Sequence, residues 1–332
     1  MKCVRLADLA HKNILITGGL GFIGSALARK LVYLGAQVTI VDSLIPQYGG
    51  NFFNINDVQA AVKVNITDLR DPHAMRYLIQ EQDYLFNLAG QVSHTDSMVD
   101  PKTDLEINAL AQLSILEVCR QHNPSIRIVF ASTRQIYGRP QYLPVDEAHP
   151  IVPVDVNGIN KQAGESYHLL YDSVYDIPTC VLRLTNTYGP GMRIKDARQT
   201  FLGIWIHNLL RGLPIKVFGD GQQLRDFNYI DDVVDAMLLA ALHPQARGEI
   251  FNLGYPEATD LKSLAAQMIA VYQSGRFEIV PFPPERKAID IGDYYGNFDK
   301  IRTMLGWEPR IPLSLGLQKT LQYYETYGEH YM

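Results

Sequence analysis

The sequence predicts an α/β fold, namely a Rossmann-type doubly wound parallel sheet followed by a smaller C-terminal lobe. Two features of the 332 residues support this prediction. Over the first half of the chain, short apolar strands alternate with helical patterns, which is typical of a parallel sheet covered by helices on both faces. After about Leu184 the alternation stops, and glycine and proline interrupt the chain, as in Tyr188-Gly189-Pro190-Gly191. We therefore expect one regular domain and one less regular lobe.

The elements of the first domain follow from apolar runs and helical spacing. Strands are predicted at about 13–17, 37–41, 61–64, 84–88, 127–132 and 178–183. Helical patterns lie between them at 22–34, 71–80, 104–122 and 158–174. The pattern at 104–122 has one apolar face, made by Leu105, Ala109, Leu113, Leu116 and Cys119. That face fits either the core or a dimer contact.

The second half of the chain leaves the first domain and returns to it. A long helix is predicted near 199–211, and a second helix at 231–242 is followed by a strand at 250–253. The predicted division is therefore residues 1–184 for the first domain, with returns near 228–254, and residues 185–332 mainly for the lobe. Because the loops of such lobes commonly carry function, we expect this one to bind substrate.

Three glycines spaced three apart follow the first predicted strand. Gly18 permits a tight turn, Gly21 lets a pyrophosphate approach the backbone, and Gly24 lets the next helix pack closely on the strand. The amides and the dipole of that helix would face the anion. Phe22 and Ile23, inside the turn, are predicted to border the same ligand.

The second predicted strand ends at Asp42, about twenty residues after the turn. A carboxylate at this place accepts hydrogen bonds from both ribose hydroxyls of NAD. No Arg or Lys follows Asp42 closely, so a 2′-phosphate would meet a carboxylate and no cation. The sequence therefore predicts NAD, and not NADP, as cofactor.

Composition limits the possible partners and location of the chain. A net charge of −5 and a pI near 6.0 provide no basic surface for a nucleic acid. The three cysteines, Cys3, Cys119 and Cys180, are far apart and form no metal-binding or disulfide pattern. No apolar run is long enough for a signal peptide or a membrane span. We expect a cytoplasmic protein with reduced thiols and neither a structural metal nor a membrane partner.

Motifs along nearly the whole chain resemble the extended short-chain dehydrogenase/reductases that act on nucleotide sugars, the epimerase and dehydratase group. They are TGGLGFIG at 17–24, Asp42, Asp68 in NITD, NLAGQV at 87–92, ASTRQIYG at 131–138, LRLTNTYGPG at 182–191, FGDGQQLRDFNYIDDVVDA at 218–236 and LGWEP at 305–309. The resemblance implies a nucleotide-diphosphate sugar as substrate and a homodimer built from the helices at 104–122 and 158–174.

The resemblance also implies roles for individual residues. Asp68 and Leu69 would border the adenine of NAD, and Leu88 and Ala89 would lie near its pyrophosphate. Thr133 stands where the family has a hydroxyl that hydrogen-bonds the reacting sugar hydroxyl.

One position departs from the family pattern. The family has a Tyr-x-x-x-Lys in which Tyr is the acid/base and Lys binds the nicotinamide ribose; here Lys161 is present, but the Tyr position holds Asn157. An amide cannot take up a proton at neutral pH. Loss of a general base typically costs about 10²- to 10⁴-fold in rate, or roughly 3 to 5.5 kcal/mol.

Three explanations of Asn157 remain open at this point. A second residue reaches the sugar, with Asp155, Tyr137, Tyr167 and His94 as candidates. Alternatively, a different sugar carbon is oxidised in a pose that uses another base. In the third explanation the protein binds NAD and a nucleotide sugar without rapid turnover. The presence of Thr133 and Lys161 favours an enzyme.

The resemblance implies a further set of substrate-binding residues. Asn186 stands where the family holds the sugar or its diphosphate, and Arg225 and Arg286 stand where arginines grip the phosphates. The planar fork of Arg suits that task because it makes two hydrogen bonds to one phosphate. Gln199 is a weaker match near the start of the lobe helix.

The residues after Thr133 bear on the reaction type. The dehydratase branch has Asp-Glu there, but this chain has Arg134-Gln135, and neither side chain is a suitable acid. The leading prediction is an NAD-dependent nucleotide-sugar epimerase that acts through a transient keto-sugar, most commonly at carbon 4. The alternatives are a nucleotide-sugar dehydratase, 2-epimerase or reductase, or a non-catalytic NAD and nucleotide-sugar binding protein.

Overall fold

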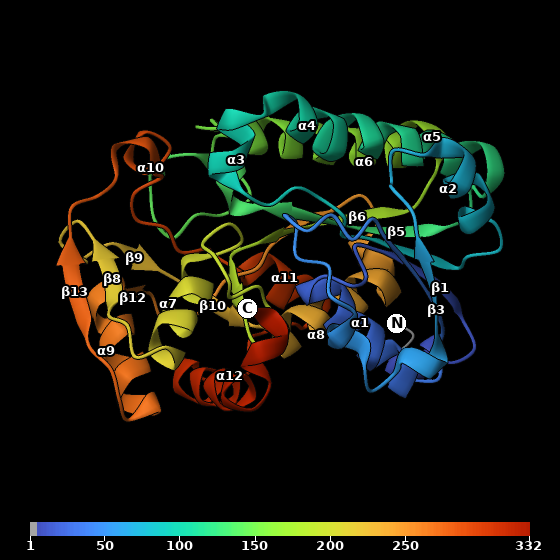
Figure 1. The fold of residues 1–332 in the computed structure, drawn as a ribbon. Helices are drawn as coiled ribbons and strands as arrows, with labels where there is room; N and C mark the ends of the chain where they lie inside the picture. Colours follow the sequence, from blue (N-terminus) through green and yellow to red (C-terminus); the bar gives the residue numbers. More distant parts are fainter. Residues whose placement is uncertain (1–4) are drawn as a thin grey trace.

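A computed structural model describes residues 5–332, and its centre is a sheet of seven parallel strands (Figure 1). The strand order is β11-β6-β5-β4-β1-β2-β3, which contains the 3-2-1-4-5-6 order of the Rossmann fold. The predicted fold class is therefore confirmed. The strands are β1 (Asn13–Thr17), β2 (Gln37–Asp42), β3 (Val62–Ile66), β4 (Tyr84–Asn87), β5 (Arg127–Thr133), β6 (Thr179–Leu184) and β11 (Ile250–Asn252).

Helices cover both faces of the sheet (Figure 1). One face carries α2 (Pro72–Ile79), α5 (Ala111–His122) and α6 (Val156–Tyr175), and the other carries α1 (Phe22–Tyr33) and α8 (Ile230–Leu242). Strand β1 shows why both faces are apolar: Leu15 packs in one core, whereas Ile14 and Ile16 pack in the other. Such a strand is buried on both sides, so it contains an unbroken apolar run.

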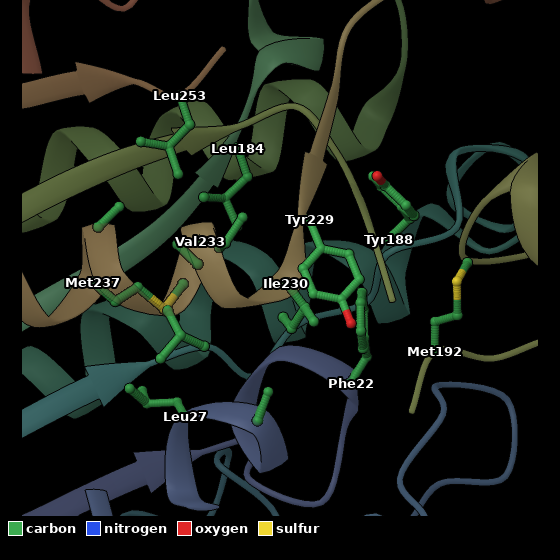
Figure 2. Close-up of a cluster of buried hydrophobic side chains, with 14 of the residues drawn as sticks. Phe22, Leu27, Leu184, Tyr188, Met192, Tyr229, Ile230, Val233, Met237 and Leu253 are labelled. Atoms are coloured by element: carbon green, nitrogen blue, oxygen red, sulfur yellow. The ribbon is translucent and has the colours of Figure 1, made fainter. Parts of the chain in front are cut away.

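The chain returns to the sheet after entering the lobe, because α8 packs on α1 and β11 pairs with β6. Figure 2 shows Phe22 and Leu27 of α1 facing Ile230, Val233 and Met237 of α8. A later helix, α11 (Asp299–Leu305), lies beside β11, a return that the sequence did not predict.

The predicted helix at 104–122 is longer and less regular than expected. It starts with α4 (Pro101–Leu105), continues through one π-helical turn, η4 (Glu106–Leu110), and ends in α5. Of its apolar face, Ala109, Leu116 and Cys119 are buried, whereas Leu105 is exposed. The face therefore divides between core and surface.

The C-terminal lobe consists of short paired strands and helices (Figure 1). Its strand pairs are β7 (Asn186–Tyr188) with β10 (Phe227–Tyr229), β8 (Ile215–Phe218) with β13 (Phe277–Val280), and β9 (Leu224–Arg225) with β12 (Thr259–Asp260). Its helices are α7 (Phe201–Leu210), α9 (Leu261–Tyr272), α10 (Pro284–Ala288) and α12 (Leu313–Tyr327). Only α7 among these helices was predicted.

Three further observations concern the partners and thiols considered above. No helix within residues 5–332 is long and apolar enough to cross a membrane. The same residues contain no cluster of His, Cys, Asp and Glu that would hold a metal ion. Cys119 and Cys180 are buried free thiols, and burial raises the pKa of each; Cys3 lies outside the described residues.

Candidate active site

The glycine turn after β1 has the geometry that its spacing predicted. Gly18 has a φ of +68°, and a Cβ there would lie 3.0 Å from the backbone of Ala89. A Cβ on Gly24 would collide with the carbonyl oxygen of Gly18 and lie 2.7 Å from the Cα of Gly19. Only glycine fits both positions without backbone movement. The turn is thereby packed against the loop that follows β4.

The first turn of α1 leaves its amides free of side-chain caps. Its N-cap is Gly21, which offers no side-chain acceptor, and the first turn contains no acidic residue. A helix start of this kind attracts an anion through its free amides and its dipole. Together with the close backbone packing, it forms a cradle suited to a pyrophosphate.

Asp42 lies at the carboxyl end of β2, on the wall of the same crevice. Its two carboxylate oxygens accept hydrogen bonds from the amides of Leu20 (3.0 Å) and Leu44 (2.9 Å). Burial raises the pKa of the carboxyl, and these two amides act in the opposite direction. Because each carboxylate oxygen has a second lone pair, the group retains acceptor capacity for ribose hydroxyls.

The other predicted cofactor residues, apart from Lys161, line the same crevice. Phe22, Ile23, Asp68, Leu69, Leu88 and Ala89 all contribute to its wall. The hydroxyl oxygen of Thr17 accepts hydrogen bonds from the amides of Leu88 (3.0 Å) and Ala89 (3.1 Å), which ties the β4 loop to the end of β1. Arg70 holds the Asp68 carboxylate at 2.8 Å and lowers its pKa.

A second cavity, of about 550 Å³, continues from the crevice. Both are lined by Phe22, Ile23, Leu88, Val92, Ala131 and Gln199. The volume lies within the range of roughly 300–1,000 Å³ that is usual for small-molecule sites. We call it the sugar cavity. It brings together Thr133, Asn157, Lys161, Asn186, Arg225 and Arg286, so all the predicted catalytic and substrate residues meet here with Gln199.

Lys161 is buried at the wall of the sugar cavity, on α6. Its Nζ donates a hydrogen bond to the carbonyl oxygen of Ala131 (3.2 Å) and lies 5.1 Å from the ring centroid of Phe130. Burial lowers the pKa of the amine to about 8, and Asp104 acts in the opposite direction. The ammonium is therefore charged at neutral pH but is held with little of its hydration.

Asn157, in the first turn of α6, is fixed by hydrogen bonds. Its Nδ2 donates to the carbonyl oxygen of Gln91 (2.8 Å) and to Oδ2 of Asp104 (3.1 Å). Asn160 donates to the other oxygen of Asp104 (2.8 Å). Both protons of the Asn157 amide are thus used by the protein, and the side chain joins the β4 loop to α4 and α6.

Of the four candidate replacements for the missing Tyr, only His94 lines the sugar cavity. Tyr137 is fully buried and donates a hydrogen bond to Asn252 (2.7 Å), and Tyr167 packs beside the core under α5 and α6. Neither lines the sugar cavity. His94 does line it, and its Nδ1 lies 3.0 Å from the buried carboxylate of Asp155.

The lobe contributes the predicted phosphate-binding residues. Arg225 is buried, and its guanidinium contacts the Gly292 carbonyl oxygen and lies 3.7 Å from Asp290. Burial, together with the nearby Arg134, lowers its pKa to about 10, so it stays charged at neutral pH. Arg286 lies over the ring of Phe218 at 5.7 Å.

Asn186 and Gln199 have structural partners as well as a place on the cavity wall. The Nδ2 of Asn186 donates to the carbonyl oxygen of Asp226 (2.9 Å), and Oε1 of Gln199 accepts from the amide of Arg193 (2.9 Å). These bonds fix the two amides at the border between the sheet and the lobe.

Sequence analysis gave no ligand-binding role to several polar groups around the sugar cavity. Ser132 Oγ and Arg134 Nε are buried on its wall without a hydrogen-bond partner among the described residues. Asn108 Oδ1 is likewise unpartnered, and a Cβ on Gly90 would lie 2.9 Å from it and 3.0 Å from Nζ of Lys161. The π-helical turn places Asn108 beside Gly90, and no motif in the sequence predicts this position.

Comparison with known proteins gives the family. The model of the NAD dependent epimerase/dehydratase family matches residues 14–254, which is more than half of the chain. The chain belongs to this family. The family resemblance drawn from the motifs is therefore confirmed, as is NAD as cofactor.

Individual relatives cover almost the whole chain. A putative UDP-glucose 4-epimerase of Methanocaldococcus jannaschii is 34% identical over 93% of this chain and 97% of its own length. UDP-glucuronic acid decarboxylase 1 of Danio rerio is 31% identical over 98% of this chain and 75% of its own length. The solved UDP-glucose 4-epimerase of Thermotoga maritima, with UDP-glucose, is 31% identical, with a TM-score of 0.87 over 95% of this chain and 99% of its own.

Proposed function

We propose that the protein is an NAD-dependent nucleotide-sugar epimerase that inverts carbon 4 of the sugar through a transient keto-sugar. The observation that carries the proposal is the continuity of two sites. The crevice with the glycine turn opens into the sugar cavity, and Thr133 and Lys161 lie on the wall of that cavity. A hydride acceptor and a sugar hydroxyl bound in these sites would be neighbours.

The residues of the crevice fit NAD, and we propose a place for each part of it. Gly18, Gly21 and Gly24 would hold the pyrophosphate, Asp42 the adenosine ribose, and Lys161 the nicotinamide ribose. When bound, NAD supplies the group that accepts the hydride from the sugar and returns it to the opposite face. The buried charge of Lys161 favours hydroxyl and oxyanion oxygens in its neighbourhood.

The sugar would be held by its diphosphate at the lobe and by its reacting hydroxyl at the sheet. Arg225 and Arg286 provide two guanidinium groups on the lobe side of the cavity. Thr133 accepts a hydrogen bond from the Gln135 amide (3.2 Å), which leaves its own hydroxyl proton available to orient the substrate. Relatives named for UDP-sugars support this substrate class.

A homodimer is part of the proposal. The surface of α3 (His94–Val99), α4, η4 and α6 carries several exposed apolar side chains: Met98, Val99, Leu105, Leu110, Ile159, Leu170, Val174 and Tyr175. Apolar side chains gathered on neighbouring helices favour association. Light scattering should give about twice the mass of 37.4 kDa, and a monomer at micromolar concentration would contradict a dimer.

The test is product analysis with a panel of nucleotide sugars. Purified protein with NAD is incubated with UDP-glucose, UDP-N-acetylglucosamine, UDP-glucuronic acid and dTDP-glucose, and the sugars are identified by NMR. We expect inversion at carbon 4 of one of them without net consumption of NAD. A 4-keto-6-deoxy product would indicate a dehydratase, loss of CO₂ a decarboxylase and inversion at carbon 2 a 2-epimerase. Net oxidation or reduction of the cofactor would indicate a reductase, and binding without product a non-catalytic protein.

A further inference from the structure

His94 and Asp155 form a pair at the wall of the sugar cavity. His94 is the first residue of α3, and Asp155 is the N-cap of α6. The Nδ1 atom of the imidazole lies 3.0 Å from Oδ2 of the carboxylate. The His94 side chain is 35% exposed and lines the cavity, whereas the Asp155 side chain is fully buried. The pair therefore presents an imidazole to the cavity and a carboxylate behind it.

The carboxylate of Asp155 is held ionised. Burial alone raises its pKa, but His94, the Gly158 amide and Gln135 outweigh that effect, so the pKa lies below its ordinary value. The Gly158 amide donates to Oδ1 at 2.6 Å, and Nε2 of Gln135 donates to Oδ2 at 2.8 Å. A buried carboxylate in this state stabilises a positive charge on the neighbouring imidazole.

The pair fixes the orientation of the imidazole. Asp155 is the ion-pair partner of Nδ1, although the N–H direction is not aligned closely enough for a full hydrogen bond. The tautomer that this contact favours carries its proton on Nδ1 and leaves Nε2 as the acceptor. In that form the ring can take a proton from a group in the cavity.

Gln135 links this pair to Thr133. The backbone amide of Gln135 donates to Oγ1 of Thr133 at 3.2 Å, and its side chain donates to Asp155. A single residue therefore sets the position of the threonine hydroxyl and of the carboxylate behind His94. The arrangement connects the end of β5 to the starts of α3 and α6.

Other charged groups near His94 are already paired or positive. Asp96, on the same helix, forms an ion pair with Arg198 at 3.1 Å, and Lys161 on α6 carries a positive charge at neutral pH. Asp290, on the lobe side of the cavity, lies within 3.7 Å of both Arg225 and Lys287. Among the described cavity residues, His94 is thus the remaining side chain that can serve as a proton acceptor.

We propose that His94, positioned by Asp155, is the proton acceptor and donor for the sugar hydroxyl beside Thr133. This inference rests on the proposed function. The hydroxyl proton would move to Nε2 of His94, and NAD, when bound, would accept the hydride of the same carbon. When the hydride returns to the sugar, Nε2 would give the proton back to the oxygen. Asp155 stays ionised throughout and stabilises the imidazolium.

The test compares His94→Gln with a matched control, His73→Gln, which changes an exposed histidine in the first turn of α2. The substrate is whichever nucleotide sugar of the panel the wild-type protein epimerises. We expect kcat of His94→Gln to fall about 10²- to 10⁴-fold, the cost of losing a general base. KM and the melting temperature should change little, and the control should match the wild type.

Two further readouts separate a catalytic role from a structural one. The acidic limb of the wild-type pH profile should be absent in His94→Ala, and added imidazole should restore part of its kcat. Asp155→Asn keeps a good N-cap residue but removes the charge. It should lower kcat by at least about tenfold, because the imidazolium loses its counter-charge, and should shift the acidic limb.

The possible failures are distinguishable. If the wild-type protein turns over a nucleotide sugar but His94→Gln retains kcat within threefold, the inference is wrong and the proposed function stands. Loss of activity without imidazole rescue, with an unchanged acidic limb, would also overturn it. If the wild-type protein yields neither product nor reduced nicotinamide with any sugar of the panel, the proposed function fails and the inference with it.

Discussion

The cofactor crevice and the sugar cavity are neighbours, but they are built in different ways. The crevice is shaped by backbone, through glycines that permit close packing and amides that hold Asp42. The sugar cavity is shaped by side chains, and Ser132 and Arg134 on its wall each have a buried polar atom without a partner among the described residues. Unpaired buried groups cost stability and are typical of sites that bind polar ligands. The comparison indicates that close packing holds the crevice rigid, whereas the cavity has buried polar atoms that a ligand can satisfy.

The largest effect is expected where the crevice depends on close packing. Gly24→Ala places a Cβ against the Gly18 carbonyl and 2.7 Å from the Gly19 Cα. Because neither backbone group can rotate away, unfolding free energy should fall by about 3 kcal/mol or more, at or above the upper end of typical overpacking costs, and NAD binding should be lost. Thermal melting measures the loss of stability, and calorimetric titration measures NAD binding. Gly212→Asn, at an exposed position with no heavy atom within 4 Å, should leave them nearly unchanged. Normal NAD affinity in Gly24→Ala would refute rigid packing.

The second effect is expected in the sugar cavity and has opposite signs for activity and stability. Lys161→Met should lower turnover at least about 10²-fold, as expected when a positioned catalytic charge is removed. The same change should stabilise the protein without NAD, because burial lowers the pKa of this lysine from 10.5 to about 8. At about 1.36 kcal/mol per pKa unit, the gain at pH 7 is of order 3 kcal/mol.

The stability gained in Lys161→Met should depend on pH. Between pH 8 and 10.5 the folded lysine is largely neutral while the unfolded lysine is still protonated. The penalty of burying its charge therefore fades as pH rises. Urea unfolding should show the gain of Lys161→Met at pH 7 shrinking by pH 10, whereas Lys63→Met, at an exposed position, should show no gain. A Lys161→Met protein that is less stable than the wild type at pH 7 would show that the buried charge of Lys161 does not destabilise the fold.

A smaller effect is expected from Asp42, a charged group of the crevice. Asp42→Asn keeps the shape but removes the negative charge proposed to bind the adenosine ribose. NAD should bind roughly tenfold more weakly, the loss of about 1.4 kcal/mol from a charged hydrogen bond, and NADP should lose less affinity or gain some. Titration with both cofactors measures the ratio, with Asp57→Asn as an exposed control. An unchanged preference for NAD would show that discrimination lies elsewhere.

An effect of the same size is expected at the lobe side of the sugar cavity. Arg286→Gln removes one of two guanidinium groups, so UDP should bind about tenfold more weakly, which corresponds to about 1.4 kcal/mol. Arg276→Gln, an exposed lobe residue, is the control. NAD affinity should be unchanged in both, because neither Arg286 nor Arg276 lines the crevice. A loss of NAD affinity in Arg286→Gln would mean that the two sites are not separable.

The sequence predicted the crevice better than the cavity, for a physical reason. The requirements of a tight turn are local, so Gly18, Gly21, Gly24 and the next strand end at Asp42 are visible in one stretch of sequence. The cavity is assembled from the starts of α3 and α6, the end of β5 and the lobe. His94 and Asp155 are 61 positions apart in the chain, and no periodic pattern predicts that they lie in contact.

The lobe was predicted least well, although some of its signals are local. The helix α9 has Leu261, Leu264, Ala265 and Met268 at helical spacing, and Asp260 caps it through a 2.8 Å bond to the Ser263 amide. The short strands of the lobe have too few residues to show a periodic apolar pattern. The π-helical turn that places Asn108 beside the cavity depends on packing against α6 and has no sequence signature.

The most direct test of the account follows the hydrogen on carbon 4. UDP-glucose deuterated at that carbon is incubated with the protein and NAD, and the inverted sugar is analysed by NMR and mass spectrometry. Hydride transfer to the cofactor and back predicts inversion with the deuterium retained at carbon 4. Inversion with loss of the deuterium to water would contradict hydride transfer. No inversion of UDP-glucose or of any other nucleotide sugar would contradict the proposed epimerase.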